Sequence, residues 1–225
     1  MPLMFSALLA FPLTGAPASA QDTTLRSDAA APRLRVDIVF VGPVLPPKVE
    51  ASAMEEITGV WALYGVDVFK ASAGDAVPDG DVRLTVVMAD HPDRPMSRRA
   101  LGSILFVDEE PQPEISMYRH AIDILVSNVR LVGSTDQQWP TAFREMIVGR
   151  VLGRGVAHEI GHYLLRSRQH AEVGLMRAPH LTNDLVGGDR RQFALSAEER
   201  MRLASFISSR LRPSSATPSA GAHSR

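Results

Sequence analysis

The run His158-Glu159-Ile160-Gly161-His162 has residue types and a spacing that suit hydrolytic metal chemistry. On a helix, side chains four residues apart lie on the same face, so His158 and His162 present two imidazoles to one point. Two nitrogen ligands at about 2.0 to 2.1 Å suit tetrahedral zinc. Glu159 flanks that point and can take a proton from a water whose pKa zinc lowers to about 7. The spacing therefore predicts a zinc site that hydrolyses its substrate.

A third protein ligand must follow further along the chain, because catalytic zinc sites take three protein ligands and keep one position for water. We expect His170 to be this ligand, since histidine is the commonest ligand of this kind. The sequence leaves three alternatives open, which are Glu172, His180 and Asp184. Cysteine is excluded as a ligand, because the chain contains none.

His170 can reach the same metal only if the motif helix ends soon after His162. On a continuous helix, a separation of eight residues would place His170 about 12 Å along the axis from His162. We therefore expect the helix to end near residues 165 to 168. No glycine lies between residues 163 and 169. For that reason we expect one of residues 167 to 169 to adopt the left-handed conformation, at a cost of about 1 to 2 kcal/mol.

The other histidines outside this region have no predicted role. His91 and His120 lie beside a proline and an arginine, and we interpret both as surface or loop residues. His223 lies in a polar segment at the end of the chain, where we expect it to be solvated.

The motif must be carried by a long helix in the second half of the chain. Pro140 is suited to a first helical position, and apolar residues then recur at helical spacing to about residue 165. A last helix is predicted from Ser196, whose hydroxyl can form a capping box with Glu199, to about residue 211. The motif thus lies late in one helix and is followed by a loop and a closing helix.

The first half of the chain is rich in short β-type runs separated by Asp, Gly and Pro. It predicts strands at residues 34–44, 66–70, 82–88 and 101–107, with an amphipathic helix at 47–64. Residues 115–132 fit either a strand at 121–126 that leads into a short helix or one continuous helix, and we expect the strand followed by the helix.

Composition excludes several classes of protein. The chain has 225 residues, of which 45% are hydrophobic and 22% charged, as in an ordinary globular protein. The formal net charge of -1 provides no excess of basic residues for nucleic acid or an anionic membrane. We expect neither a nucleic acid partner nor a membrane anchor.

The two ends of the chain differ from the middle. Residues 1–20 contain a short apolar stretch and end in Ala18-Ser19-Ala20, which is typical of a cleavable secretory signal. The mature chain would then begin near Gln21. Residues 21–33 and 213–225 are polar and rich in small residues, so we expect flexible segments around a domain at 34–212.

The motif at residues 158–162, followed by His170 and then Gly174-Leu175-Met176 before a closing helix, resembles a zincin metallopeptidase, and within that group a minimal metzincin. The resemblance implies an α+β, zincin-like fold: a small twisted mixed β-sheet with a backing helix, a long active-site helix beneath it and a C-terminal helix. It also implies a third zinc-binding histidine, a turn containing methionine below the metal, and an edge strand that pairs with an extended substrate.

The sequence departs from the metzincin pattern in three ways. Leu165 and Arg168 stand where the pattern has a glycine and the third histidine, and His170 is eight residues after His162. The methionine also follows the third histidine sooner than is usual. Met176 is therefore either the residue of that turn or a core residue.

We therefore expect a secreted or periplasmic zinc metalloendopeptidase that acts as a monomer on peptide or protein substrates. Zn²⁺ would be held by His158, His162 and His170, with Glu159 as the general base and acid. One alternative is a secreted zinc-binding module that has lost turnover. Another is zinc-dependent amide hydrolysis on a non-protein substrate.

Overall fold

The computed structural model describes residues 33–92, 100–131 and 133–212. The predicted signal at 1–20, nearly all of the predicted segment at 21–33 and the predicted tail at 213–225 lie outside this part. The described residues form one five-stranded mixed sheet and five α-helices, together with a two-stranded pair. The predicted α+β class is confirmed.

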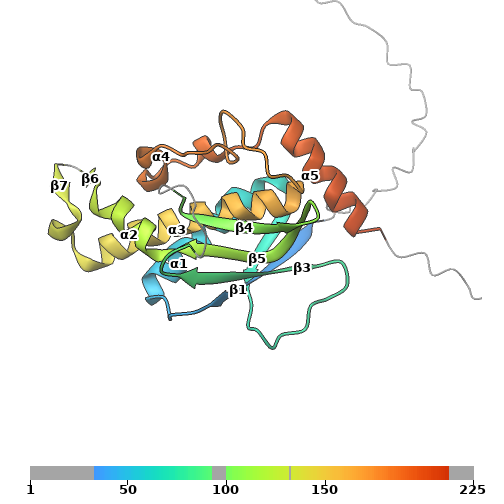
Figure 1. Cartoon of the computed structure of the whole chain (residues 1–225), viewed down its shortest axis with the longest axis horizontal. Coiled ribbons are helices and arrows are strands. Elements are labelled where there is room, and N and C mark those ends of the chain that lie inside the picture. Colours follow the sequence, from blue (N-terminus) through green and yellow to red (C-terminus); the bar gives the residue numbers. More distant parts are fainter. Residues whose placement is uncertain (1–32, 93–99, 132, 213–225) are drawn as a thin grey trace, which may run out of the picture. The chain divides into compact units, whose positions relative to one another are not determined.

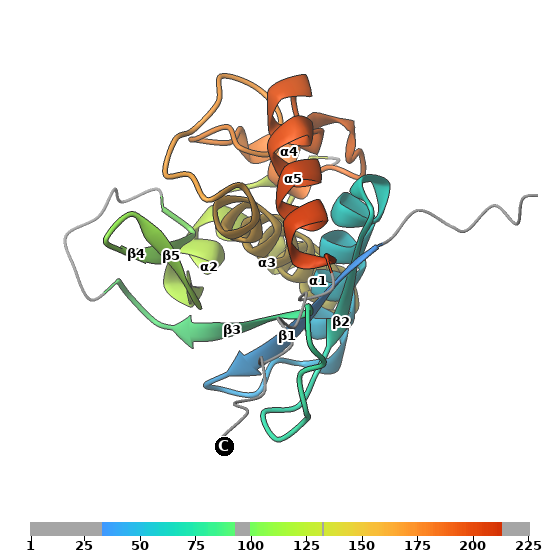
Figure 2. The same ribbon diagram turned by 90° about the vertical axis from the view of Figure 1, so that its right-hand side faces the viewer.

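The main sheet has the strand order β2-β1-β3-β5-β4 (Figure 1 and Figure 2, where β2 is labelled). Its strands are β1 (Leu34–Val41), β2 (Val66–Lys70), β3 (Val82–Ala89), β4 (Gly102–Val107) and β5 (Glu110–Tyr118). Neighbours pair in parallel except β4, which is antiparallel to β5 at the edge. In β3 every second residue from Val82 to Met88 is buried, as expected for a strand with one face on the core. The four predicted strands are confirmed, with small differences at their ends.

Two helices pack side by side against this sheet, α1 (Pro47–Trp61) and the long α3 (Thr141–Leu165) (Figure 2). Glycine on α3 permits their close approach. A side-chain carbon built on Gly153 would lie 2.5 Å from the carbonyl oxygen of Ala53. The predicted helix at 47–64 and the motif helix are both confirmed, although the last turn of the former is a 3-10 turn, η1 (Ala62–Tyr64).

The strand predicted at residues 121–126 is wrong. These residues lie in α2 (Arg119–Ser127), which follows β5 directly. Ile122 and Val126 are four residues apart and are both buried. Since a short apolar run fits a strand or a buried helix equally well, its periodicity alone did not distinguish the two.

The rest of the described chain consists of short elements and the closing helix. They are β6 (Arg130–Leu131), β7 (Ser134–Thr135), η2 (Asp136–Gln138), α4 (Thr182–Val186), η3 (Arg191–Phe193) and α5 (Ala197–Arg210). The predicted capping box is confirmed, because Glu199 N donates to Ser196 Oγ at 3.2 Å and Ser196 N to the Glu199 carboxylate at 2.7 Å. Among the described residues, no helix combines the length and apolar character needed to span a membrane.

Candidate metal centre

The C-terminal half of α3 carries both motif histidines in a buried position. Only 8% of His158 and 5% of His162 is exposed, and their Nε2 atoms are 3.1 Å apart. Each Nδ1 atom contacts a backbone carbonyl instead. His158 Nδ1 lies 2.7 Å from Leu175 O, and His162 Nδ1 lies 2.6 Å from Ser167 O.

These contacts determine the tautomer of both rings. A carbonyl oxygen only accepts hydrogen bonds, so Nδ1 carries the proton in His158 and in His162. In the neutral rings the two Nε2 lone pairs then face each other at 3.1 Å. Burial, with a further contribution from His162, lowers the pKa of His158 to about 3, so protonation does not relieve this contact near neutral pH. A shared cation would satisfy both nitrogens, and the carbonyls are typical outer partners of metal-binding histidines.

The end of α3 is where the sequence required it to be. The helix ends at Leu165, and Arg166 adopts the left-handed conformation with φ 49° and ψ 46°. The predicted end of the helix is confirmed, but the expectation that one of residues 167 to 169 would be left-handed is wrong. Arg166 N and Ser167 N donate to carbonyls of the last turn, a pattern that puts the left-handed residue directly after the helix.

His170 reaches the motif pair from the loop that follows α3. One ring nitrogen from each of His158, His162 and His170 lies within 4.8 Å of the others, and no other such trio occurs in the described part of the chain. The ring of His170 stacks on His158 at 5.3 Å between centroids and is nearly perpendicular to His162 at 4.9 Å. His170 is exposed while the other two are buried, so the trio borders solvent on this side.

The loop after His170 folds back beneath the motif. Ala171 N donates to Met176 O at 2.8 Å, and the side chain of Met176 is 2% exposed. A side-chain carbon built on Gly161 would collide with the sulfur of Met176. Gly161 therefore allows the side chain of Met176 to pack closely against α3. The neighbouring Leu175 supplies the carbonyl that orients His158.

Glu159 is buried between α3 and the edge strand β4. Only 7% of the residue is exposed. Burial raises the pKa of Glu159 to about 8, partly opposed by a hydrogen bond from the backbone of Ile104. A carboxyl group in this environment can hold a proton near neutral pH and exchange it with a neighbouring water or amine.

The alternative third ligands are not members of the trio, although the ring of His180 lies 5.4 Å from that of His158 between centroids. His180 Nε2 is 3.1 Å from Leu175 O, the carbonyl that also contacts the first motif histidine. Asp184 faces Arg177 at 3.7 Å, and Glu172 is exposed. None of the three belongs to the histidine trio. His180 therefore contacts the same loop carbonyl, Leu175 O, that orients His158.

Charged side chains from α1, α3 and the segment after α4 form a cluster around the buried carboxylate of Glu56, about one turn before the motif. Glu56 on α1 accepts from Arg154 Nε at 3.1 Å and from Arg190 Nε at 3.0 Å, with Arg150 Nε at 3.4 Å. Burial acts to raise the pKa of Glu56, but the hydrogen bonds and charges of Arg190 and Arg154 outweigh it and lower that pKa. The cluster ties α1, α3 and the segment after α4 together. Sequence reasoning missed it, because its members are up to 134 residues apart.

Comparison of the sequence with protein-family models gave no match, and comparison with curated proteins gave none either.

Proposed function

We propose that this protein is a zinc-dependent peptidase of the zincin type, with zinc held by His158, His162 and His170. The observation that carries the proposal is the pair of Nε2 lone pairs facing each other at 3.1 Å, with the third imidazole beside them. Three imidazoles and an open position are the ligand set of a catalytic zinc site. The antiparallel edge strand, the backing helix and the turn below Gly161 support the same type of fold.

Glu159 is the proposed proton carrier. When bound, zinc would act as a Lewis acid and lower the pKa of water at the site. Glu159 follows a ligand directly on α3, and the backbone of Ile104 hydrogen-bonds its carboxyl group. From this position Glu159 would accept a proton from water and return it to the leaving amine.

The edge strand supports a peptide as the substrate. Among the described residues, β4 is the last strand of the sheet and pairs with β5 alone, and its Ile104 hydrogen-bonds the proposed general base. Leu105 and Val107 on β4 are each 49% exposed. An extended peptide can add to such an edge through main-chain hydrogen bonds, with its side chains against exposed apolar groups. Export to the periplasm or medium is also proposed, on the sequence of residues 1–20 alone.

A peptide-library digest with the purified, zinc-loaded protein tests the proposal. Glu159→Gln should lower cleavage by several orders of magnitude while zinc content stays the same, because the change removes a proton acceptor and no ligand. Glu172→Gln, which changes an exposed carboxylate of the loop after His170, is the matched control and should cleave at the parent rate.

Two outcomes would contradict the proposal in different ways. A Glu159→Gln variant that cleaves as fast as the parent would remove Glu159 from the mechanism. A parent protein that binds zinc but cleaves no member of the library would favour a zinc-binding module without turnover.

A further inference from the structure

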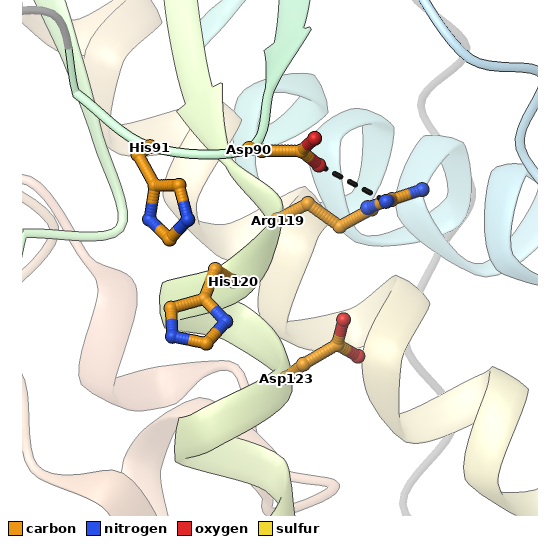
Figure 3. Close-up of a pocket in the computed structure, with 5 residues that line it drawn as sticks. All are labelled: Asp90, His91, Arg119, His120 and Asp123. Carbon is orange, nitrogen blue, oxygen red and sulfur yellow. Dashed lines mark ion pairs between the residues drawn. The ribbon is translucent and has the colours of Figure 1, made fainter.

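His91 and His120 lie together at the opposite end of α3 from the candidate metal centre. His91 follows the end of β3, and His120 is in the first turn of α2. Their ring centroids are 4.7 Å apart at an interplanar angle of 62°. With Asp90, Arg119 and Asp123 they line a cavity of about 260 Å³ (Figure 3). Both are exposed, as the sequence predicted, but their proximity was not predicted.

Backbone and side-chain contacts hold the two segments together. His120 N donates to Asp90 O at 3.3 Å. Arg119 Nη2 pairs with Asp90 Oδ1 at 3.0 Å (Figure 3). Asp90, which precedes His91, is therefore linked to the start of α2, and Arg119, which precedes His120, is linked to the segment after β3. This double link fixes the two histidine backbones beside each other without using either imidazole.

The carboxylates of the cavity are engaged in ion pairs. Of its five lining residues, two are aspartates and one is an arginine. Arg119 and Arg144 balance the charges of the two aspartates, so the cavity has no excess charge of either sign. The Arg119 ion pair occupies Asp90, and Asp123 faces Arg144 at 3.4 Å. The imidazole nitrogens are thus the groups left to bind an ion.

The ring separation suits two ligands of one metal ion. His158 and His162 in the candidate zinc centre have the same centroid separation of 4.7 Å. With a metal–nitrogen bond of about 2.0 to 2.1 Å and about 1.1 Å from nitrogen to ring centre, two rings on one metal can lie up to about 6.4 Å apart, so the separation of 4.7 Å is within that reach. In Figure 3 the nitrogens of His120 point away from His91. Its ring must rotate to bind, which its exposed position allows.

We infer that His91 and His120 form a second metal site, which binds a divalent transition cation such as Zn²⁺ through two imidazoles and completes its coordination with water. Two imidazole ligands suit zinc, nickel and copper rather than magnesium or calcium. The site is separate from the first. Arg144, which contacts Asp123 of this cavity, lies fourteen residues before His158 on α3, about 21 Å along the axis.

Calorimetric titration of the purified protein with Zn²⁺ at pH 7.5 tests this inference. After the first site is filled, the parent should bind one further Zn²⁺ in a weaker step. His91→Ala and His120→Ala should each lose the weaker step and keep the first one. His223→Ala is the control, since it removes a histidine of the tail, and it should keep both steps.

The result does not depend on peptidase activity, so it separates this inference from the proposed function. Both variants change exposed side chains and should unfold at the parent temperature, which circular dichroism checks. A parent that binds a single Zn²⁺, which both the His91→Ala and His120→Ala variants keep, would overturn the inference. So would a weaker step that persists in either the His91→Ala or the His120→Ala variant.

Discussion

The proposed zinc chemistry depends on which nitrogen of each histidine is protonated. Two backbone carbonyls, from Leu175 and Ser167, hold the Nδ1 protons of His158 and His162. This leaves both Nε2 atoms as lone pairs directed at one point. Neither carbonyl could be identified from the sequence, because each contact depends on how the loop after α3 folds back. The spacing of the histidines alone predicted that the rings would meet.

Loss of His170 should weaken zinc binding strongly. His170→Ala removes one of three proposed ligands, and even the loss of an outer partner costs about 10- to 100-fold in affinity. We therefore expect a loss of more than about 100-fold, measured by competition with a chromophoric chelator. Glu172→Ala, two residues further on, should keep the parent affinity. Equal affinities for the two variants would show that His170 is not a ligand.

At the scale of elements, the contact between α1 and α3 should tolerate no added carbon at Gly153. A methyl group there would lie 2.5 Å from Ala53 O, and overpacking of this kind costs about 1 to 3 kcal/mol. Gly153→Ala should therefore lower the urea midpoint of unfolding. Gly188→Ala is the control, because a side-chain carbon at Gly188 meets no atom within 4 Å. Similar midpoints for both variants would contradict the packing described here.

The elements themselves were predictable to different degrees. The end of α3 followed from a physical requirement, since an unbroken helix would separate His170 from His162. β5 was not predicted, because Pro111 and Pro113 argue against a strand. The structure pairs Pro111 with Phe106 of β4, and Pro113 lies in the irregular stretch between this pair and the pair of Ile104 with Ile115. Proline is accepted in a strand with one neighbour and at a bulge. The cluster around Glu56 left no local signal, because its partners come from distant parts of the chain.

At the scale of the whole molecule, Glu159 should reduce the stability of the zinc-free protein at neutral and higher pH. Its folded pKa of about 8 lies above the ordinary value of 4.5. Because the pKa of Glu159 is higher in the folded than in the unfolded chain, its protonated form stabilises the fold fully below pH 4.5. This stabilisation is lost as pH rises through about 8. Zinc-free Glu159→Gln should thus be more stable than the zinc-free parent at pH 7 to 8, by about 3 to 4 kcal/mol.

The pH dependence of this difference in stability provides a control. The difference in unfolding free energy between parent and Glu159→Gln should shrink as pH falls towards 4.5, because Glu159 is then protonated in both the folded and unfolded chains. Urea titrations across this range measure it. A difference that does not change with pH would show that burial does not raise the pKa of Glu159.

X-ray absorption at the zinc edge of the purified, zinc-loaded protein tests most directly whether the three histidines bind zinc. The Zn²⁺ concentration should be low enough to fill only the tightest site, so that one zinc environment dominates the spectrum. We expect three imidazole nitrogens and one oxygen at about 2.0 to 2.1 Å, with one imidazole fewer in His170→Ala. A parent spectrum with two or fewer imidazoles, or a protein that takes up no zinc, would contradict a metal centre built from His158, His162 and His170.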